Sequence, residues 1–120
     1  MQKLEEEAMK FMQLHNKSMI TADEYQRKAG ETAIYPKKDA LPYLSLGLVS
    51  EAGEVAGKIK KLIRDKTKLD VASEVGDVLW YCAMLASEVG VSLGKIMENN
   101  LEKLNDRKQR GKLQGSGDTR

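Results

Sequence analysis

Residues 41–62 read LPYLSLGLVSEAGEVAGKIKKL and carry the strongest helical pattern in the chain. Apolar side chains recur there at steps of three and four, which is the period of one face of an α-helix. These positions are Leu41, Leu44, Leu48, Ala52, Val55, Ile59 and Leu62. The spacing predicts one long helix with Asp39 as its N-cap, Pro42 in its first turn and its end near Asp65.

The segment that follows predicts a second helix, capped by Asp70 and ended by Gly90. It is apolar nearly all round from Val78 to Ala86, so it needs cover on more than one side. The short polar connection at residues 66–69 favours antiparallel packing of the two helices. A chain of 120 residues has too few other helices to cover such a surface. We therefore expect an all-α fold, a helical bundle completed by dimerisation.

Further helices are expected on both sides of this pair. Residues 2–16 predict an amphipathic helix whose apolar face ends at His15. A packing role for this lone histidine is far more common than metal ligation. Thr21 and Glu24 match a capping box for a helix that Pro36 stops. Ser92 caps a last helix over residues 93–110.

The chain divides into three parts on this pattern. Residues 1–20 are a helical extension, residues 21–110 are the all-α domain, and residues 111–120 are a glycine-rich tail. The 20 basic and 18 acidic residues leave a net charge of +2, which gives no general field for nucleic acid or membrane. The longest apolar run is far short of the roughly 20 residues of a membrane span, and no signal peptide is expected. The single cysteine, Cys82, lies in an apolar run and is interpreted as a core residue of a cytoplasmic protein.

Two pairs of carboxylates are the most informative feature. Glu51 and Glu54 lie three residues apart, as do Glu74 and Asp77, so each pair shares one face of its helix. Both pairs border the apolar stripe rather than lying opposite it. In an antiparallel hairpin the four acids converge, and two unit charges 4 Å apart repel by about 4 kcal/mol at an effective dielectric near 20. The pattern indicates a magnesium site, and the alternative is solvated helix surface.

Other metal chemistries fit the residues less well. No glutamate is followed three residues later by histidine, as a di-iron bundle requires. Zinc needs several histidine or cysteine ligands, and this chain has one residue of each type, in different segments. No glycine-rich turn after a strand provides a Walker-type phosphate loop. Magnesium with oxygen ligands is what remains.

The pair Glu51-x-x-Glu54, nineteen residues and the pair Glu74-x-x-Asp77 resemble the ExxE…ExxD signature of the MazG-like all-α nucleoside triphosphate pyrophosphohydrolases. The resemblance runs from about Tyr25 to the C-terminus. It includes the segments Tyr25-Gln26, Thr32-Ala33-Ile34-Tyr35-Pro36, Leu46-Gly47-Leu48, Glu74-Val75-Gly76-Asp77-Val78-Leu79-Trp80-Tyr81, Asn100-x-x-Lys103-Leu104-x-x-Arg107 and the tail from Arg110 to Arg120.

This resemblance implies an enzyme that cleaves between the α and β phosphates and releases a nucleoside monophosphate and pyrophosphate. It implies Mg²⁺ held by the four acids, one of whose glutamates acts as the base, and a site completed by dimerisation. The phosphate ligands it implies are Asn100, Lys103 and Arg107, whose ordinary role is an exposed basic face. Tyr81 and Tyr35 are expected to line a base pocket, whereas Trp80 is expected to pack against another helix or subunit.

The identity of the nucleotide stays open, because the motif contacts phosphates and metal rather than the base. Standard or modified triphosphates, dUTP, dCTP and phosphoribosyl-ATP all remain candidates. The assembly is expected to be a homodimer or a dimer of dimers. The alternative function is a non-catalytic helical dimer whose basic tail binds an acidic partner.

Overall fold

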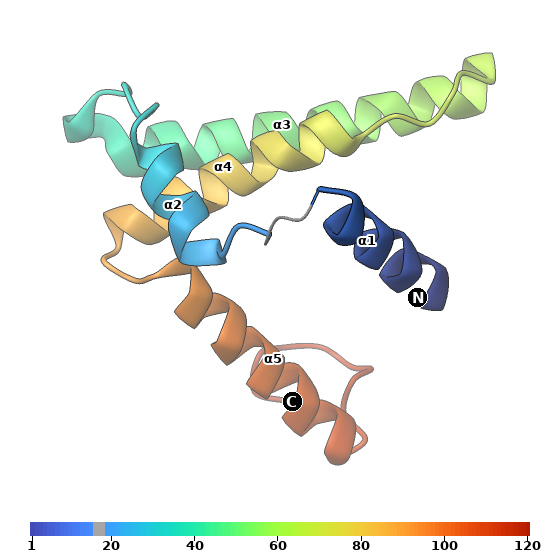
Figure 1. Cartoon of the computed structure of the whole chain (residues 1–120). Helices are drawn as coiled ribbons and strands as arrows, with labels where there is room; N and C mark the ends of the chain where they lie inside the picture. The colour runs from blue at the N-terminus through green and yellow to red at the C-terminus, as the bar shows by residue number, and fades with distance from the viewer. Residues whose placement is uncertain (16–18) are drawn as a thin grey trace.

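The computed structural model describes residues 1–15 and 19–120, with side chains for residues 1–10 and 19–120 (Figure 1). The described residues form only helices, so the predicted all-α class is confirmed. In chain order these are α1 (Gln2–His15), α2 (Ala22–Gly30), the 3-10 helix η1 (Lys37–Asp39), α3 (Ala40–Asp65), α4 (Ala72–Glu88) and α5 (Leu93–Gln109). The predicted end of the first helix at position 16 and the side chain of His15 lie outside the described residues.

Helices α3 and α4 form a long antiparallel hairpin, as the short connection predicts (Figure 1). Lys66 ends α3 in the left-handed conformation, with φ of 56°, and its N–H donates to the Leu62 carbonyl. Asp39 stands at the N-cap of α3 as predicted, whereas the predicted cap of α4 is wrong. Val71 rather than Asp70 stands at the N-cap of α4, and the Asp39 side chain makes no capping hydrogen bond to α3.

Helix α2 crosses the hairpin at the end of α4 and holds the start of α5 (Figure 1). Thr21 caps α2 as predicted, because its hydroxyl accepts from the Glu24 N–H at 3.1 Å. The Gln26 side chain accepts from the Leu93 N–H at 2.7 Å, and Asp23 accepts from the Gly94 N–H at 2.8 Å. These bonds satisfy N–H groups of the first turn of α5 that have no partner within the helix.

The buried core of a single chain is small and lies where α2, α3 and α4 meet. Leu44 and Met84 are its largest fully buried side chains. The other core members are Ala29, Tyr35, Ala40, Ala83 and Leu93. In contrast, Leu46, Val49 and Ile63 on α3 are 73%, 71% and 71% exposed. On α4, Met84 is buried but Val75 and Leu79 are about half exposed, so one chain provides only part of the predicted cover of α4.

Helix α1 packs against no other helix in the described part of the chain, and Figure 1 shows it apart from them. Within the described residues, no helix is both long and apolar enough to cross a membrane.

Candidate active site

The four predicted acids lie along the seam between α3 and α4. On α3, positions 47, 51, 54 and 58 follow steps of four, three and four. On α4, positions 74, 77 and 81 follow steps of three and four, and Asp70 precedes the helix. Positions at these steps form one face of a helix and meet in an antiparallel pair. Contacts fix the register at both ends, because Gly47 faces the Tyr81 ring and Lys58 bonds the Asp70 carbonyl. The register sets Glu51 opposite Asp77, and Glu54 opposite Glu74.

The side chains of Glu51 and Asp77 line one shallow hollow. Its volume is about 360 Å³, and it is lined by Thr32, Glu51, Asp77, Trp80 and Tyr81. Burial raises the pKa of the Tyr81 hydroxyl, and the charges of Tyr43, Glu51 and Asp77 raise it further. Two carboxylates and two aromatic rings therefore share one water-accessible recess.

Glu74 takes a different partner. Its carboxylate accepts from the Lys58 ammonium at 2.7 Å, and only 15% of the Glu74 side chain is exposed. The hydrogen bond from Lys58 holds the pKa of Glu74 below its ordinary value of 4.5. The second carboxylate oxygen, Oε2, is buried without a hydrogen-bond partner in the described part of the chain.

The four acids do not close into one metal-binding group within a single chain. Among the side chains of residues 1–10 and 19–120, no three from histidine, cysteine, aspartate or glutamate lie close enough to hold an ion together. The acids form two neighbouring pairs instead, with Glu51 and Asp77 at the hollow and with Glu54 and Glu74 next to Lys58. The donor set is nonetheless all oxygen, and the unpaired Glu74 Oε2 is an open ligand position, which suits a hard cation.

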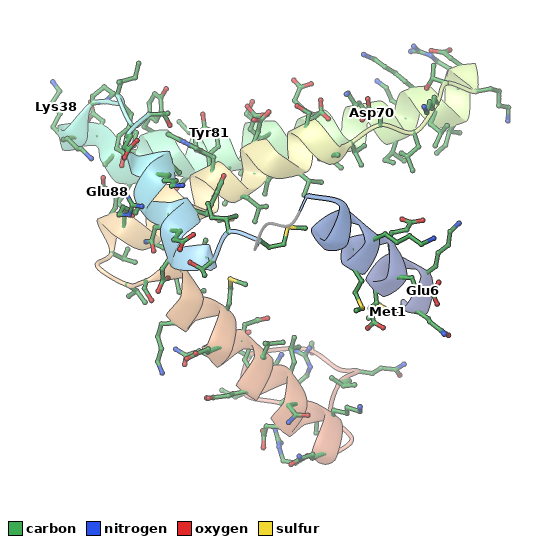
Figure 2. The ribbon with its side chains drawn as sticks, in the orientation of Figure 1. Met1, Glu6, Lys38, Asp70, Tyr81 and Glu88 are labelled. Atoms are coloured by element: carbon green, nitrogen blue, oxygen red, sulfur yellow. The ribbon has the colours of Figure 1, made fainter. Side chains whose placement is uncertain are left out.

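The close contact at Gly47 explains why Tyr81 reaches the hollow. A Cβ on Gly47 would lie 2.1 Å from the Tyr81 ring, so only glycine leaves room for the ring to lie against α3. Figure 2 shows Tyr81 on the hairpin near α2 and Asp70 toward the far tip. Of the glycines within α3 and α4, only Gly47 meets a neighbour, and Gly53, Gly57 and Gly76 face open space. Within one chain, close helix approach is thus limited to Gly47 among these four glycines.

Tyr35 lies in the core next to the hollow rather than in it. It is 7% exposed and its hydroxyl donates to Glu88, which also pairs with Lys37 at 3.2 Å. The Tyr35 ring contacts the Trp80 ring edge-on at a centroid separation of 6.3 Å. Tyr35 thus supports Trp80 from behind, and the structure brings Tyr81 but not Tyr35 to the acids.

Trp80 and Lys58 also lie at the site, although the sequence did not predict a site role for either. Trp80 packs against the core as predicted, but it also lines the hollow, where its indole N–H donates to the Thr32 hydroxyl at 2.8 Å. Lys58 lies four residues after Glu54, which is the helical spacing of an ion pair. This spacing is the sequence feature that could have indicated Lys58 as a neighbour of the acids.

The three predicted phosphate ligands on α5 lie apart from the acids in a single chain. Asn100 and Lys103 are exposed as expected, on a helix that extends away from the hairpin (Figure 1). Arg107 was expected to be exposed and is 4% exposed instead. Its guanidinium donates to the Asp118 carbonyl at 2.8 Å, because the C-terminal tail folds back over α5.

Comparison with known proteins identifies a family match over the helices that carry the acids. Residues 42–111, which span α3, α4 and α5, match the MazG nucleotide pyrophosphohydrolase domain. The chain belongs to the MazG nucleotide pyrophosphohydrolase family. It is also similar to the Gene 37 protein of Mycobacterium phage L5, at 46% identity over 111 residues that cover 82% of this chain and 97% of that protein. No solved structure matches this MazG-family chain.

The family match contains all four acids, Lys58 and the three α5 residues. Helices α1 and α2 lie outside it. The four acids Glu51, Glu54, Glu74 and Asp77 between α3 and α4, here called the acid seam, and helix α5 are therefore the parts of this MazG-family chain that carry the likeness.

Proposed function

We propose that the chain is a nucleoside triphosphate pyrophosphohydrolase that cleaves between the α and β phosphates. The products are a nucleoside monophosphate and pyrophosphate. The observation that carries this proposal is the seam of Glu51, Glu54, Glu74 and Asp77 beside an aromatic hollow. Family membership supports the reaction class.

The acid seam fits a divalent cation. Its donors are carboxylate oxygens, and Glu74 Oε2 is buried and free of a hydrogen bond in the described residues. We assign Glu51, Glu54, Glu74 and Asp77 as ligands of Mg²⁺. When bound, this ion shields the phosphate charge and lowers the pKa of a water molecule next to the phosphorus.

The carboxylates also provide the proton acceptor for hydrolysis. A glutamate next to the attacking water takes its proton as the oxygen bonds to phosphorus. The α-phosphorus to bridging-oxygen bond breaks, and pyrophosphate leaves with the electron pair. Glu51 and Glu54 are the two candidates for this base.

The aromatic hollow is suited to the nucleobase. Tyr81 and Trp80 line it next to Glu51 and Asp77, so a base stacked there sets its triphosphate toward the acids. The indole N–H of Trp80 already donates a hydrogen bond to the Thr32 hydroxyl. We therefore expect the base to stack on the Trp80 ring face rather than to accept from this N–H.

We further propose that a second copy of the chain completes the site. Asn100 and Lys103 lie on α5, which extends away from the acid seam of its own chain (Figure 1). Phosphate contacts by these residues therefore require the seam of a partner. The exposed apolar side chains of α3, including Leu46 and Val49, provide a surface for such pairing.

A panel of nucleoside triphosphates tests this function. Standard and modified ribo- and deoxyribonucleotides are incubated with the protein and Mg²⁺, and pyrophosphate and monophosphate are measured. We expect equal amounts of both products, no free orthophosphate, and no reaction when EDTA removes the metal. The matched control is Asp77→Asn, which keeps the side-chain shape and removes one ligand charge.

Absence of pyrophosphate release from every triphosphate would contradict this function. The alternative, a non-catalytic helical dimer with a basic tail for an acidic partner, would then be favoured. Release of orthophosphate in place of pyrophosphate would show a different bond cleaved and would also contradict the proposal.

A further inference from the structure

Lys58 is the cation of the acid seam in this structure. Its ammonium lies 2.7 Å from Glu74 Oε1 and 3.0 Å from the Asp70 carbonyl. The hydrogen bond to Glu74 raises the pKa of Lys58, and the charges of Glu74, Asp70 and Glu54 raise it further. One ammonium therefore bonds a proposed metal ligand, Glu74, and a backbone oxygen.

This arrangement is that of a small cation site occupied by a side chain. Lys58 is 39% exposed, so its flexible stem has room to move outward. The Glu74 side chain is only 15% exposed, so its carboxylate has less room to move than the Lys58 ammonium. Of the two carboxylate oxygens of Glu74, the ammonium of Lys58 bonds only Oε1. The second oxygen, Oε2, has no hydrogen-bond partner among the described residues and is therefore free to bind a metal ion.

The charge balance explains why such a residue is needed. Clustered carboxylates repel one another in the absence of a counter-ion, and Lys58 neutralises one of them before any metal arrives. A monovalent ammonium is the weaker competitor, because a divalent ion has twice the charge and binds several oxygens at once. Exchange of one cation for the other keeps the seam neutralised in both states.

We propose that Lys58 is the resident cation of the acid seam and that magnesium binds by displacing its ammonium from Glu74. This inference rests on the proposed function, because it takes Glu54 and Glu74 as metal ligands. Lys58 acts here through Glu74 and is a positioning residue rather than a catalytic one. It holds Glu74 in place in the metal-free protein and lowers the affinity of the seam for magnesium.

The test compares magnesium binding by the full-length parent, Lys58→Met and Lys60→Met without nucleotide. Calorimetry gives the dissociation constant of Mg²⁺, and thermal melting gives the stability without metal. Lys60 is the matched control, since it lies on the same helix, is exposed and makes no ion pair in the described part of the chain. We expect Lys58→Met to bind magnesium about fivefold or more tightly, as loss of a partly exposed ion pair predicts. Its metal-free melting temperature should fall, because Glu74 loses its partner.

Salt separates direct competition from a long-range charge effect. In roughly 1 M KCl the Debye length falls to about 3 Å, so the loss of a distant charge no longer alters metal binding. The difference between Lys58→Met and the parent should persist there, whereas any effect of Lys60→Met should vanish. As a check that needs no variant, the side-chain NMR signal of Lys58 in the parent should shift as magnesium is added.

The possible failures are distinct. Equal magnesium affinity in the parent and in Lys58→Met would overturn the exchange, and so would a raised KM for nucleotide with unchanged magnesium affinity. A parent that releases pyrophosphate but binds no magnesium without nucleotide would also overturn it, while leaving the proposed function intact. A parent that neither binds magnesium nor releases pyrophosphate would overturn both.

Discussion

At the scale of single residues, Arg107 shows how the tail changes the role of a side chain. Glycines 111, 115 and 117 have positive φ, which lets the chain turn back over α5. Arg107 donates to the Asp118 carbonyl there, and its Nε is buried without a partner in the described residues. The sequence pattern placed Arg107 on an exposed face with Lys103, because helical spacing alone does not include the tail.

Arg107→Ala and Lys103→Ala should therefore differ in their effects on stability. Loss of the buried guanidinium is expected to lower the free energy of unfolding by about 1–3 kcal/mol, since it removes tail hydrogen bonds and packing. The exposed Lys103→Ala should stay within about ±0.5 kcal/mol and raise KM for the nucleotide. Urea unfolding and steady-state kinetics measure both effects. Equal stability of Arg107→Ala and the parent would show that the tail does not bury this side chain in solution.

At the scale of elements, the seam between α3 and α4 determines where the acids lie. Helical spacing predicted which acids share a face, and the short connection predicted the antiparallel pairing. The contact partner of each acid depends on the register between the helices, which no single helix pattern contains. This is why the Lys58–Glu74 pair across the seam was not found, although the Glu54 and Lys58 spacing was visible.

Gly47→Ala tests this register. The added methyl group overlaps the Tyr81 ring, so either the ring or the helix must move. We expect a loss of stability of about 1–3 kcal/mol, the usual effect of overpacking. The control Gly57→Ala meets no atom within 4 Å and should raise helix stability by up to about 1 kcal/mol. Thermal or urea unfolding that ranks the two variants the other way would contradict the register.

At the scale of the whole molecule, one chain leaves much apolar surface exposed. Val75 and Leu79 on α4 are 46% and 48% exposed, in addition to the exposed side chains of α3. The sequence predicted a bundle from the apolar circumference of α4, and a single chain provides only part of the cover. The apolar periodicity of the helices indicates how much surface needs to be covered. It does not indicate how a second chain is oriented on that surface, because this depends on contacts between the chains.

We predict that the protein is a dimer or a larger assembly at micromolar concentration. Leu46→Lys and Val49→Lys place charges on the exposed face of α3 and should weaken association, since a buried unpaired charge is costly. Analytical ultracentrifugation of the parent and variants measures the mass. A folded monomer for the parent at these concentrations would contradict the dimer proposal.

The proposed magnesium site is tested most directly by measuring pyrophosphate release by Glu51→Gln and Asp77→Asn, which alter the two acids of the hollow. We expect each variant to lose about a hundredfold or more in magnesium-dependent kcat, which corresponds to about 2.7 kcal/mol or more in the barrier. Their metal-free stability should equal or exceed that of the parent, because each change removes one of two facing charges. Glu98→Gln on α5, whose exposed carboxylate pairs only with Lys95 in the described residues, is the control and should keep full activity. Full magnesium-dependent turnover in both hollow variants would contradict the proposed site.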